Sequence, residues 1–378
     1  MTSRPVSSHI SRRRFIGGVV VGSGLLFFPR FSRAVDALAP SRKLGVALVG
    51  LGGYSTNQLG PALRQTQHCR LTGVVTGDRA KGKKWAHDYG FSEKNIFGYE
   101  TIEQIAGNPD IDVIYIVTPN SLHAGHCIAA AKAGKHVICE KPMALSVAEC
   151  DAMIAACKAA GVRLMIGYRL HYEPHHIELA RLAHDKVFGA FMRMDGANGF
   201  LMRGTSADTG NWRANKKLAG GGPLMDMGVY VIQAACMAKV EVAPTAVTAH
   251  FGPVTRPELF SEVEESVRWE MEFSDGAKAT CLATYAENLS RFRADAEGGW
   301  ARLEQPAFYY DEPKLTTSKG AVHLPKVNHQ AAQLDGMALE LMTGQPSRAP
   351  GEMGRRDVAI IEAIYAAAKS GQRSTVQL

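Results

Sequence analysis

Residues 43–55, KLGVALVGLGGYS, form the stretch that decides the fold. An apolar run that leads into glycines predicts a strand, a tight turn and a helix whose free N–H groups face anionic oxygens. Ser55 stands where a third glycine or alanine is usual, so the motif alone is weak. Its place after a predicted strand favours a dinucleotide site over a simple glycine turn. The predicted cofactor-binding residues of this loop are Gly50, Leu51, Gly52, Gly53 and Tyr54.

Outward from this stretch, predicted strands and helices alternate. Apolar runs at 69–78, 112–121, 135–142 and 163–169 are expected as four further strands. Helices are expected at 80–90, 122–134 and 146–161, and the last two end in a glycine suited to the C′ position. Strands that are apolar on both faces and alternate with helices predict a parallel sheet covered on both sides.

The pattern changes after about residue 172. Residues 265–287 alternate apolar and polar side chains around Asp275-Gly276, which predicts an antiparallel hairpin with one face buried. With further strands at 190–197 and 246–252, the second half is expected to hold an open, mostly antiparallel sheet. Residues 354–371 predict a helix that packs back on the body. The fold class is therefore an α/β Rossmann domain at 43–168 followed by an α+β domain at 169–378.

The first 34 residues have the layout of an export signal. Four arginines precede an apolar run at 17–29, small residues at 32 and 34 suit cleavage, and residues 11–16 resemble the twin-arginine motif. We expect a signal peptide at 1–34, a short arm at 35–42 and a periplasmic protein that the twin-arginine machinery exports already folded. An uncleaved leader that acts as a loose tether is the alternative.

Charge and hydropathy exclude two classes of partner. The signal-like segment holds six of the 43 basic residues and no acid, which leaves 37 bases against 36 acids and no basis for nucleic-acid binding. No later stretch approaches the ~18 to 20 apolar residues of a membrane span, so no stable membrane anchor is expected. The seven cysteines are an odd number without a CxxC pair, which predicts buried thiols and no metal site.

The end of the second predicted strand bears on which nucleotide binds. The hydroxyl of Thr76 and the charges of Arg79 and Lys81, around Gly77, suit a 2′-phosphate and favour NADP, whereas Asp78 leaves NAD as the alternative.

A family resemblance rests on longer motifs. TPNSLHA (118–124), KHVICEKPMA (135–144), MIGYRLHYEP (165–174), WRANKKLAGGGPLMDMGVY (212–230) and PGEMGRRDVAIIEAIYAAAKSG (350–371) resemble the Gfo/Idh/MocA oxidoreductases, most closely their glucose-fructose and aldose-aldose oxidoreductase branch. The resemblance covers nearly the whole chain after Lys43. It implies that Lys141 orients the substrate, Asp226 binds it and Tyr230 donates and accepts the proton. Further cofactor contacts are implied at Tyr99, Pro119, Asn120, His123, Glu140, Lys141, Arg169, Trp212, Arg213 and Tyr309, and His171 and Tyr172 are expected to line the sugar pocket.

The chemistry can be reasoned separately from the resemblance. Oxidation of a hydroxyl sends a hydride to the nicotinamide while a base takes the proton. A helix that begins at Pro223 places Asp226 and Tyr230 four residues apart on one face. A phenol is a poor base at neutral pH unless a cation lies near it, and Lys141 is the expected cation. A buried core tyrosine is the plain alternative.

The resemblance implies an exported enzyme that oxidises an aldose at C1 to an aldonolactone. Tightly bound NADPH would then pass the hydride to a second sugar in ping-pong fashion. The alternatives are a sugar or inositol dehydrogenase with diffusible NAD(P) and a non-catalytic sugar sensor. Only residues 35–43 separate the signal-like segment from the first strand, where glucose-fructose oxidoreductase has a long proline-rich arm. A homodimer through the open sheet is therefore expected rather than a tetramer.

Overall fold

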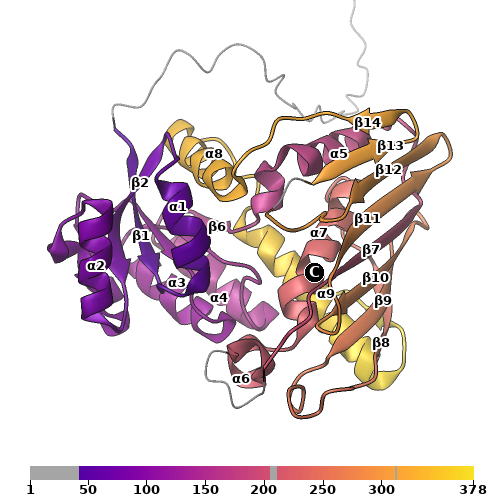
Figure 1. Cartoon of the computed structure of the whole chain (residues 1–378), viewed down its shortest axis with the longest axis horizontal. Coiled ribbons are helices and arrows are strands. Elements are labelled where there is room, and N and C mark those ends of the chain that lie inside the picture. The colour runs from indigo at the N-terminus through magenta and orange to yellow at the C-terminus, as the bar shows by residue number, and fades with distance from the viewer. Residues whose placement is uncertain (1–41, 205–210, 311–312) are drawn as a thin grey trace, which may run out of the picture. The chain divides into compact units, whose positions relative to one another are not determined.

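The first sheet is parallel and follows the predicted alternation of strands and helices. The computed structural model describes residues 42–204, 211–310 and 313–378, so the predicted export signal lies outside the described residues. Six strands run in the order β3-β2-β1-β4-β5-β6 (Figure 1). Their bounds are β1 Leu44–Val49, β2 Cys69–Val75, β3 Ile96–Phe97, β4 Val113–Ile116, β5 His136–Cys139 and β6 Leu164–Ile166. Every neighbouring pair is parallel, as predicted, and only the two-residue β3 was not expected.

Helices connect these strands. Three of them match the predicted stretches, and Gly134 and Gly161 follow α3 and α4 in the left-handed conformation with φ of +70° and +65°. The helical segments are η1 Ser55–Leu59, α1 Gly60–Leu63, α2 Arg79–Tyr89, η2 Glu93–Asn95, η3 Tyr99–Ile105, η4 Asn120–Leu122, α3 His123–Lys132 and α4 Val147–Ala159.

The second sheet is mixed but mostly antiparallel. Its nine strands run in the order β14-β13-β12-β11-β7-β10-β9-β8-β15, and β7 pairs in parallel with β10. The predicted hairpin is present, with Trp269 opposite Cys281. The bounds are β7 Arg193–Gly199, β8 Ala246–Phe251, β9 Ser266–Glu272, β10 Lys278–Thr284, β11 Leu289–Ala296, β12 Gly299–Glu304, β13 Lys314–Thr317, β14 Gly320–Val322 and β15 Ser374–Thr375.

The helices of the second half link the two sheets. The last one, α9, packs against α4 and β6 of the first half and against α7 and β8 of the second, as predicted (Figure 1). The segments are η5 Arg169–Tyr172, α5 Pro174–His184, η6 Trp212–Ala214, α6 Lys216–Ala219, η7 Leu224–Gly228, α7 Val229–Ala238, α8 His329–Thr343 and α9 Gly351–Ser370.

The thiols lie inside the protein. All seven cysteines are free and buried, which confirms the prediction from their odd number. Over the residues described, no helix is both long and apolar enough to cross a membrane.

Gly45 at the start of β1 gives a test of this packing. A Cβ at this position would lie 1.8 Å from the Asp110 carbonyl oxygen, so Gly45→Ala should lower the free energy of unfolding by about 1–3 kcal/mol. Gly125 of α3 is the matched control, because its Cβ would meet nothing within 4 Å. Gly125→Ala should be neutral or stabilising by up to about 1 kcal/mol. Urea unfolding measures both, and equal stability of the two variants would contradict the close approach at Gly45.

Candidate active site

A cavity of about 230 Å³ lies at the carboxyl ends of β4, β5 and β6. This edge of a parallel sheet is where ligands of doubly wound folds bind. The second half of the chain closes the cavity with residues from η6, η7 and α7, from the end of β7, and from the segment between β12 and β13. The lining residues are Tyr54, Val117, Thr118, Asn120, His123, Glu140, Lys141, Arg169, Phe200, Trp212, Arg213, Asp226, Met227, Tyr230, Phe308, Tyr309 and Tyr310.

Lys141 and Asp226 form a buried ion pair in this cavity. Lys141 follows the end of β5, and its Nζ donates to Asp226 Oδ1 at 2.9 Å and to the Asp226 carbonyl at 2.8 Å. Asp226 Oδ2 accepts from Arg213 Nε at 2.8 Å and from Tyr285 Oη at 3.2 Å. Burial opposes the charge of Asp226, but Lys141 and Arg213 outweigh it and hold the pKa of this carboxyl well below its usual range. The site therefore contains a carboxylate held by two cations.

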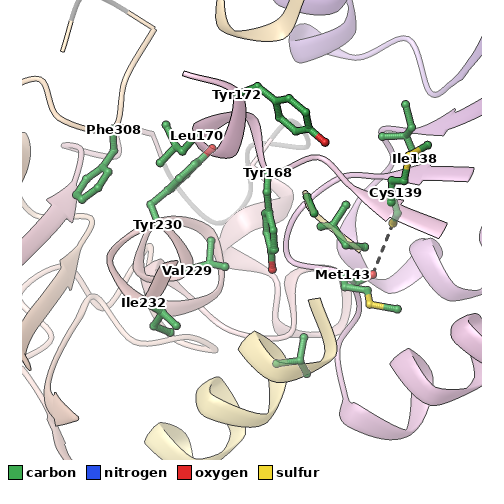
Figure 2. Packing of buried hydrophobic residues seen from close by; sticks show 14 of the residues in the cluster. Ile138, Cys139, Met143, Tyr168, Leu170, Tyr172, Val229, Tyr230, Ile232 and Phe308 are labelled. Atoms are coloured by element: carbon green, nitrogen blue, oxygen red, sulfur yellow. Dashed lines mark hydrogen bonds between the residues drawn. The ribbon is translucent and has the colours of Figure 1, made fainter. Parts of the chain in front are cut away.

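Tyr230 lies beside this pair. Asp226 lies in η7, a π-helical turn, and Tyr230 follows at the start of α7, so both side chains line the cavity. Lys141 Nζ lies 4.7 Å from the centroid of the Tyr230 ring, and the Phe308 ring lies 6.3 Å away on centroids. Figure 2 shows the Tyr230 and Phe308 rings alongside one another. Although Tyr230 is 8% exposed, it lines the cavity and is not enclosed wholly in the apolar core.

Two buried residues hold the segment around Lys141. Glu140 accepts hydrogen bonds from Tyr115 Oη at 2.6 Å and from the Lys141 N–H at 3.2 Å, and burial raises the pKa of its carboxyl. The ring nitrogens of His123 lie 3.0 Å from the Pro142 carbonyl and 2.9 Å from the Thr118 carbonyl. The loops after β4 and β5 are therefore fixed to each other.

The glycine loop offers an open cradle for a dinucleotide. Gly50 has φ of +96°, which suits the tight turn after β1. Gly52 and Gly53 are exposed, and a Cβ at Gly52 would meet nothing within 4 Å. Ser55 fits in place of a third glycine because its hydroxyl donates to the Gly50 carbonyl at 2.6 Å. This backbone fits the approach of a pyrophosphate.

Residues after β2 gather next to the same loop. Lys81 Nζ donates to the Leu51 carbonyl, and the Thr76 hydroxyl accepts from the Asp78 N–H at 3.2 Å. The Asp78 carboxylate caps α2 by accepting from the Lys81 N–H at 3.0 Å. Tyr99 lies against Gly77 and stacks on the His126 ring with centroids 5.4 Å apart.

The remaining predicted cofactor contacts fall in three places. Asn120 lines the cavity, where its Nδ2 donates to the Ala219 carbonyl at 2.9 Å, and Pro119 lies half-buried on the same loop. Arg79 is exposed at the start of α2. Trp212, Arg213 and Tyr309 line the cavity, and Tyr309 Oη donates to the Gly199 carbonyl at 2.5 Å.

His171 and Tyr172, which were expected to line the sugar pocket, are not among the residues that line this cavity. Tyr172 Oη donates to the Glu340 carboxylate at 3.1 Å, and its ring is directed away from Tyr230 (Figure 2). His171 packs against the Tyr168 ring with centroids 6.0 Å apart. The reason is local, because η5 is a single 3₁₀ turn that directs Arg169 into the cavity and its neighbours to other faces.

Several lining residues were not predicted from the sequence. They are Val117, Thr118, Phe200, Met227, Phe308 and Tyr310. Phe308 and Tyr310 flank the predicted Tyr309 in one aromatic run, which was a signal that they also line the cavity. No sequence signal pointed to Tyr285. It follows β10 and donates to Asp226, but 59 residues separate the two in the sequence.

Comparisons with known proteins agree with this geometry. A family model described as "Oxidoreductase family, NAD-binding Rossmann fold" matches residues 44–168, and the GFO/IDH/MocA C-terminal domain matches residues 176–302. The crystal structure of aldose-aldose oxidoreductase from Caulobacter crescentus is 39% identical with a TM-score of 0.83, and the match covers 88% of this chain and 100% of that one.

A curated relative is similar over nearly its full length. D-xylose 1-dehydrogenase [NADP(+)] from Haloarcula marismortui is 29% identical over 91% of this chain and 95% of its own length. A structure of levoglucosan dehydrogenase, 21% identical with a TM-score of 0.75, shares the fold over 89% of this chain and 100% of that one. The glycine loop, the two sheets and these matches together show that the chain belongs to the Gfo/Idh/MocA oxidoreductase family.

Proposed function

We propose that this protein is an exported, NADP-dependent aldose oxidoreductase. It oxidises an aldose at C1 to an aldonolactone and returns the hydride to a second sugar from a cofactor that stays bound. The observation that carries the proposal is the meeting of Lys141, Asp226 and Tyr230 in one cavity with the glycine-loop residue Tyr54. The similarity to aldose-aldose oxidoreductase supports the reaction class.

Different side chains of the cavity orient the sugar, transfer its proton and exclude water. Lys141 and Asp226 are already paired at 2.9 Å and present donors and acceptors that orient a sugar hydroxyl. Tyr230 takes the hydroxyl proton in the oxidation and gives a proton in the reduction. When bound, the nicotinamide accepts and donates the hydride. The rings of Phe200, Trp212 and Tyr309 form an apolar part of the cavity lining and exclude water from the reacting atoms.

NADP is the cofactor that the loop around β2 favours. Lys81 lies at the glycine loop and Thr76 and Tyr99 lie near Gly77, so a cation, a hydroxyl and an aromatic ring surround the place of a 2′-phosphate. The only acid among the six residues after β2, Asp78, is engaged in capping α2. The NADP-dependent xylose dehydrogenase supports the same choice.

Export in the folded state explains why a cofactor would stay bound. Free NADP(H) is not expected outside the cytoplasm, so a periplasmic enzyme must carry its own and reoxidise it with a second sugar in the same site. The buried thiols fit a protein that folds in a reducing compartment. We further propose a homodimer through the open second sheet.

A dehydrogenase with diffusible NAD(P) is the second candidate. The likeness to D-xylose 1-dehydrogenase favours it, as does the short segment between the signal-like residues and β1.

Cofactor content separates the two candidates. Protein purified without added nucleotide should contain about one NADP(H) per chain, because folding precedes export. An aldose such as glucose or xylose should reduce it in a single turnover, seen as nicotinamide absorbance, and a second sugar should restore the oxidised spectrum. Empty protein that turns over with added NAD(P) would favour the diffusible-cofactor dehydrogenase, and no absorbance change with any aldose would contradict both.

Tyr230→Phe tests the proton carrier. Loss of the hydroxyl should slow hydride transfer by ~10²- to 10⁴-fold, as for removal of a general acid or base, and leave the bound cofactor in place. Tyr172→Phe is the matched control, because its hydroxyl is buried against Glu340 and lies outside the cavity. Single-turnover kinetics and cofactor content measure both. Unfolding of the Tyr230 variant would instead indicate a core tyrosine.

Lys141→Ala tests the orienting cation. The variant removes a charged donor from the cavity, so kcat/KM should fall by about 10- to 100-fold, with part of the loss in KM. Lys84→Ala is the control, because Lys84 is exposed on α2 and pairs only with Asp88 among the described residues. Steady-state kinetics with one aldose measures both variants. Values of kcat and KM close to wild type for Lys141→Ala would refute the substrate-orienting role of Lys141.

A further inference from the structure

Arg169 is the most buried cation beside Tyr230. It follows β6 in η5 and is 2% exposed, yet it lines the cavity. Its Cζ lies 5.1 Å from the centroid of the Tyr230 ring and 4.8 Å from that of Tyr310. Its Nε has no hydrogen-bond partner among the described residues.

Among the described residues no carboxylate forms an ion pair with Arg169, and only the Glu140 carboxyl, which lines the same cavity, is stabilised by its charge from farther away. One guanidinium nitrogen donates to the Phe308 carbonyl, and Nη1 lies 3.1 Å from His329 Nδ1. His329 accepts this bond as the neutral imidazole, because burial and the nearby Arg169 lower its pKa to about 4. Over residues 42–204, 211–310 and 313–378 the structure contains no ion pair of Arg169.

Lys141 is in a different electrostatic position. Two of its three N–H donors are directed at Asp226, at 2.8 and 2.9 Å, so its charge is matched by a carboxylate in direct contact. A matched charge has less effect on a third group than an unmatched one at a similar distance. Lys141 and Arg169 lie 4.7 and 5.1 Å from the Tyr230 ring, so the balance of charge rather than distance distinguishes them.

The other charged and titratable groups around Tyr230 are acids, phenols or a cation that is already paired with Asp226. Asp226 lies one turn before it, Glu140 follows β5, and Tyr309 and Tyr310 follow β12. Tyr54 faces it from the glycine loop, and burial raises the pKa of Tyr54 and, to about 12, that of Tyr310. Arg213 is committed to Asp226 at 2.8 Å. Burial lowers the pKa of Arg169, but Tyr230 foremost, then Tyr310 and Tyr54, raise it by more.

We propose that Arg169 is the cation that stabilises the phenolate form of Tyr230 and so makes this tyrosine a base, while Lys141 orients the substrate. The inference rests on the proposed function. In the oxidation the substrate hydroxyl O–H bond breaks and its proton moves to the Tyr230 oxygen, and a bound oxidised nicotinamide would take the hydride of the C1–H bond. In the reduction the phenol returns the proton as the second sugar takes the hydride. Arg169 is a positioning residue that changes no bond.

The pH dependence of hydride transfer tests the assignment. An opposite charge this close favours the ionised form by about one to three pH units. In Arg169→Met the pH at half-maximal single-turnover rate should therefore rise by about that amount, whatever the change in the maximal rate. Arg169→Lys keeps the charge and should restore much of the wild-type midpoint. Arg163→Met is the matched control, because Arg163 also donates to main-chain carbonyls and lies outside the cavity.

A spectroscopic titration keeps the test independent of activity. The ultraviolet absorbance of tyrosinate is followed against pH in wild type and in Tyr230→Phe, and their difference isolates residue 230. The same difference is measured in the Arg169→Met and Arg169→Lys backgrounds. We expect the signal of residue 230 to move to higher pH only in Arg169→Met.

The outcomes are distinct. A lower rate at every pH with an unchanged midpoint and an unchanged tyrosinate signal would show that Arg169 only holds the cofactor or the fold, and would overturn the proposal. Wild-type protein that no aldose reduces, but whose tyrosinate signal depends on Arg169, would refute the proposed function and leave the assignment of Arg169 standing. If Arg169→Met does not fold, Arg169→Lys alone decides. A pH midpoint in Arg169→Lys that rises by about one to three units, as expected for loss of the charge, would also overturn the proposal.

Discussion

The site depends on the ion pairs that the buried Asp226 carboxylate forms with Lys141 and Arg213. Through Lys141 the carboxylate joins the end of β5 in the first sheet to η7, and through Arg213 and Tyr285 it joins η7 to η6 and to the end of β10. Removal of one partner of a buried ion pair leaves an uncompensated charge and costs about 3–5 kcal/mol, so the four side chains are expected to hold one arrangement. This network gives the cavity a polar lining where the two sheets meet, and α9, which packs against elements of both halves, adds contacts between them.

The rest of the fold serves to place the partners of Asp226. Lys141 reaches the cavity because β5 ends at Cys139, and the parallel register with β4 and β6 brings the loops after all three strands to one edge. Tyr230 reaches it from the start of α7, whose residues are all buried, and Asp226 reaches it from η7, the turn directly before that helix. Glu140, through the Tyr115 hydroxyl of β4, and His123, through the Pro142 and Thr118 carbonyls, then join β4 and its loop to the loop after β5, so that the polar groups are preorganised before a ligand binds.

Much of this fold could be predicted from the sequence, and the limits have physical causes. Hydrophobic periodicity and the glycine loop predicted both sheets, but two-residue β3 carries no periodic signal. Lys141, Asp226 and Tyr230 were found through motifs, and the structure brings them together. His171 and Tyr172 lie outside the cavity lining because a 3₁₀ turn sends successive side chains to different faces, which spacing alone does not reveal. Phe200, Phe308 and Tyr310 were missed because an aromatic residue of the core and one of a cavity wall look alike in sequence, and Tyr285 meets Asp226 only through the fold.

The charges of the cavity follow from two opposing needs. A sugar must be held by groups that do not change protonation, and paired Lys141 and Asp226 meet this need because each keeps the other charged, with the pKa of Lys141 above and that of Asp226 below its ordinary value. A proton carrier must instead change protonation in every half-reaction, so it cannot itself be held in a tight ion pair. Tyr230 lies against Lys141 and Arg169 through its ring, and no ion pair holds it within the described residues. One cation paired with a carboxylate and one without an ion pair among the described residues, both near the Tyr230 ring, form the arrangement that the proposed roles require.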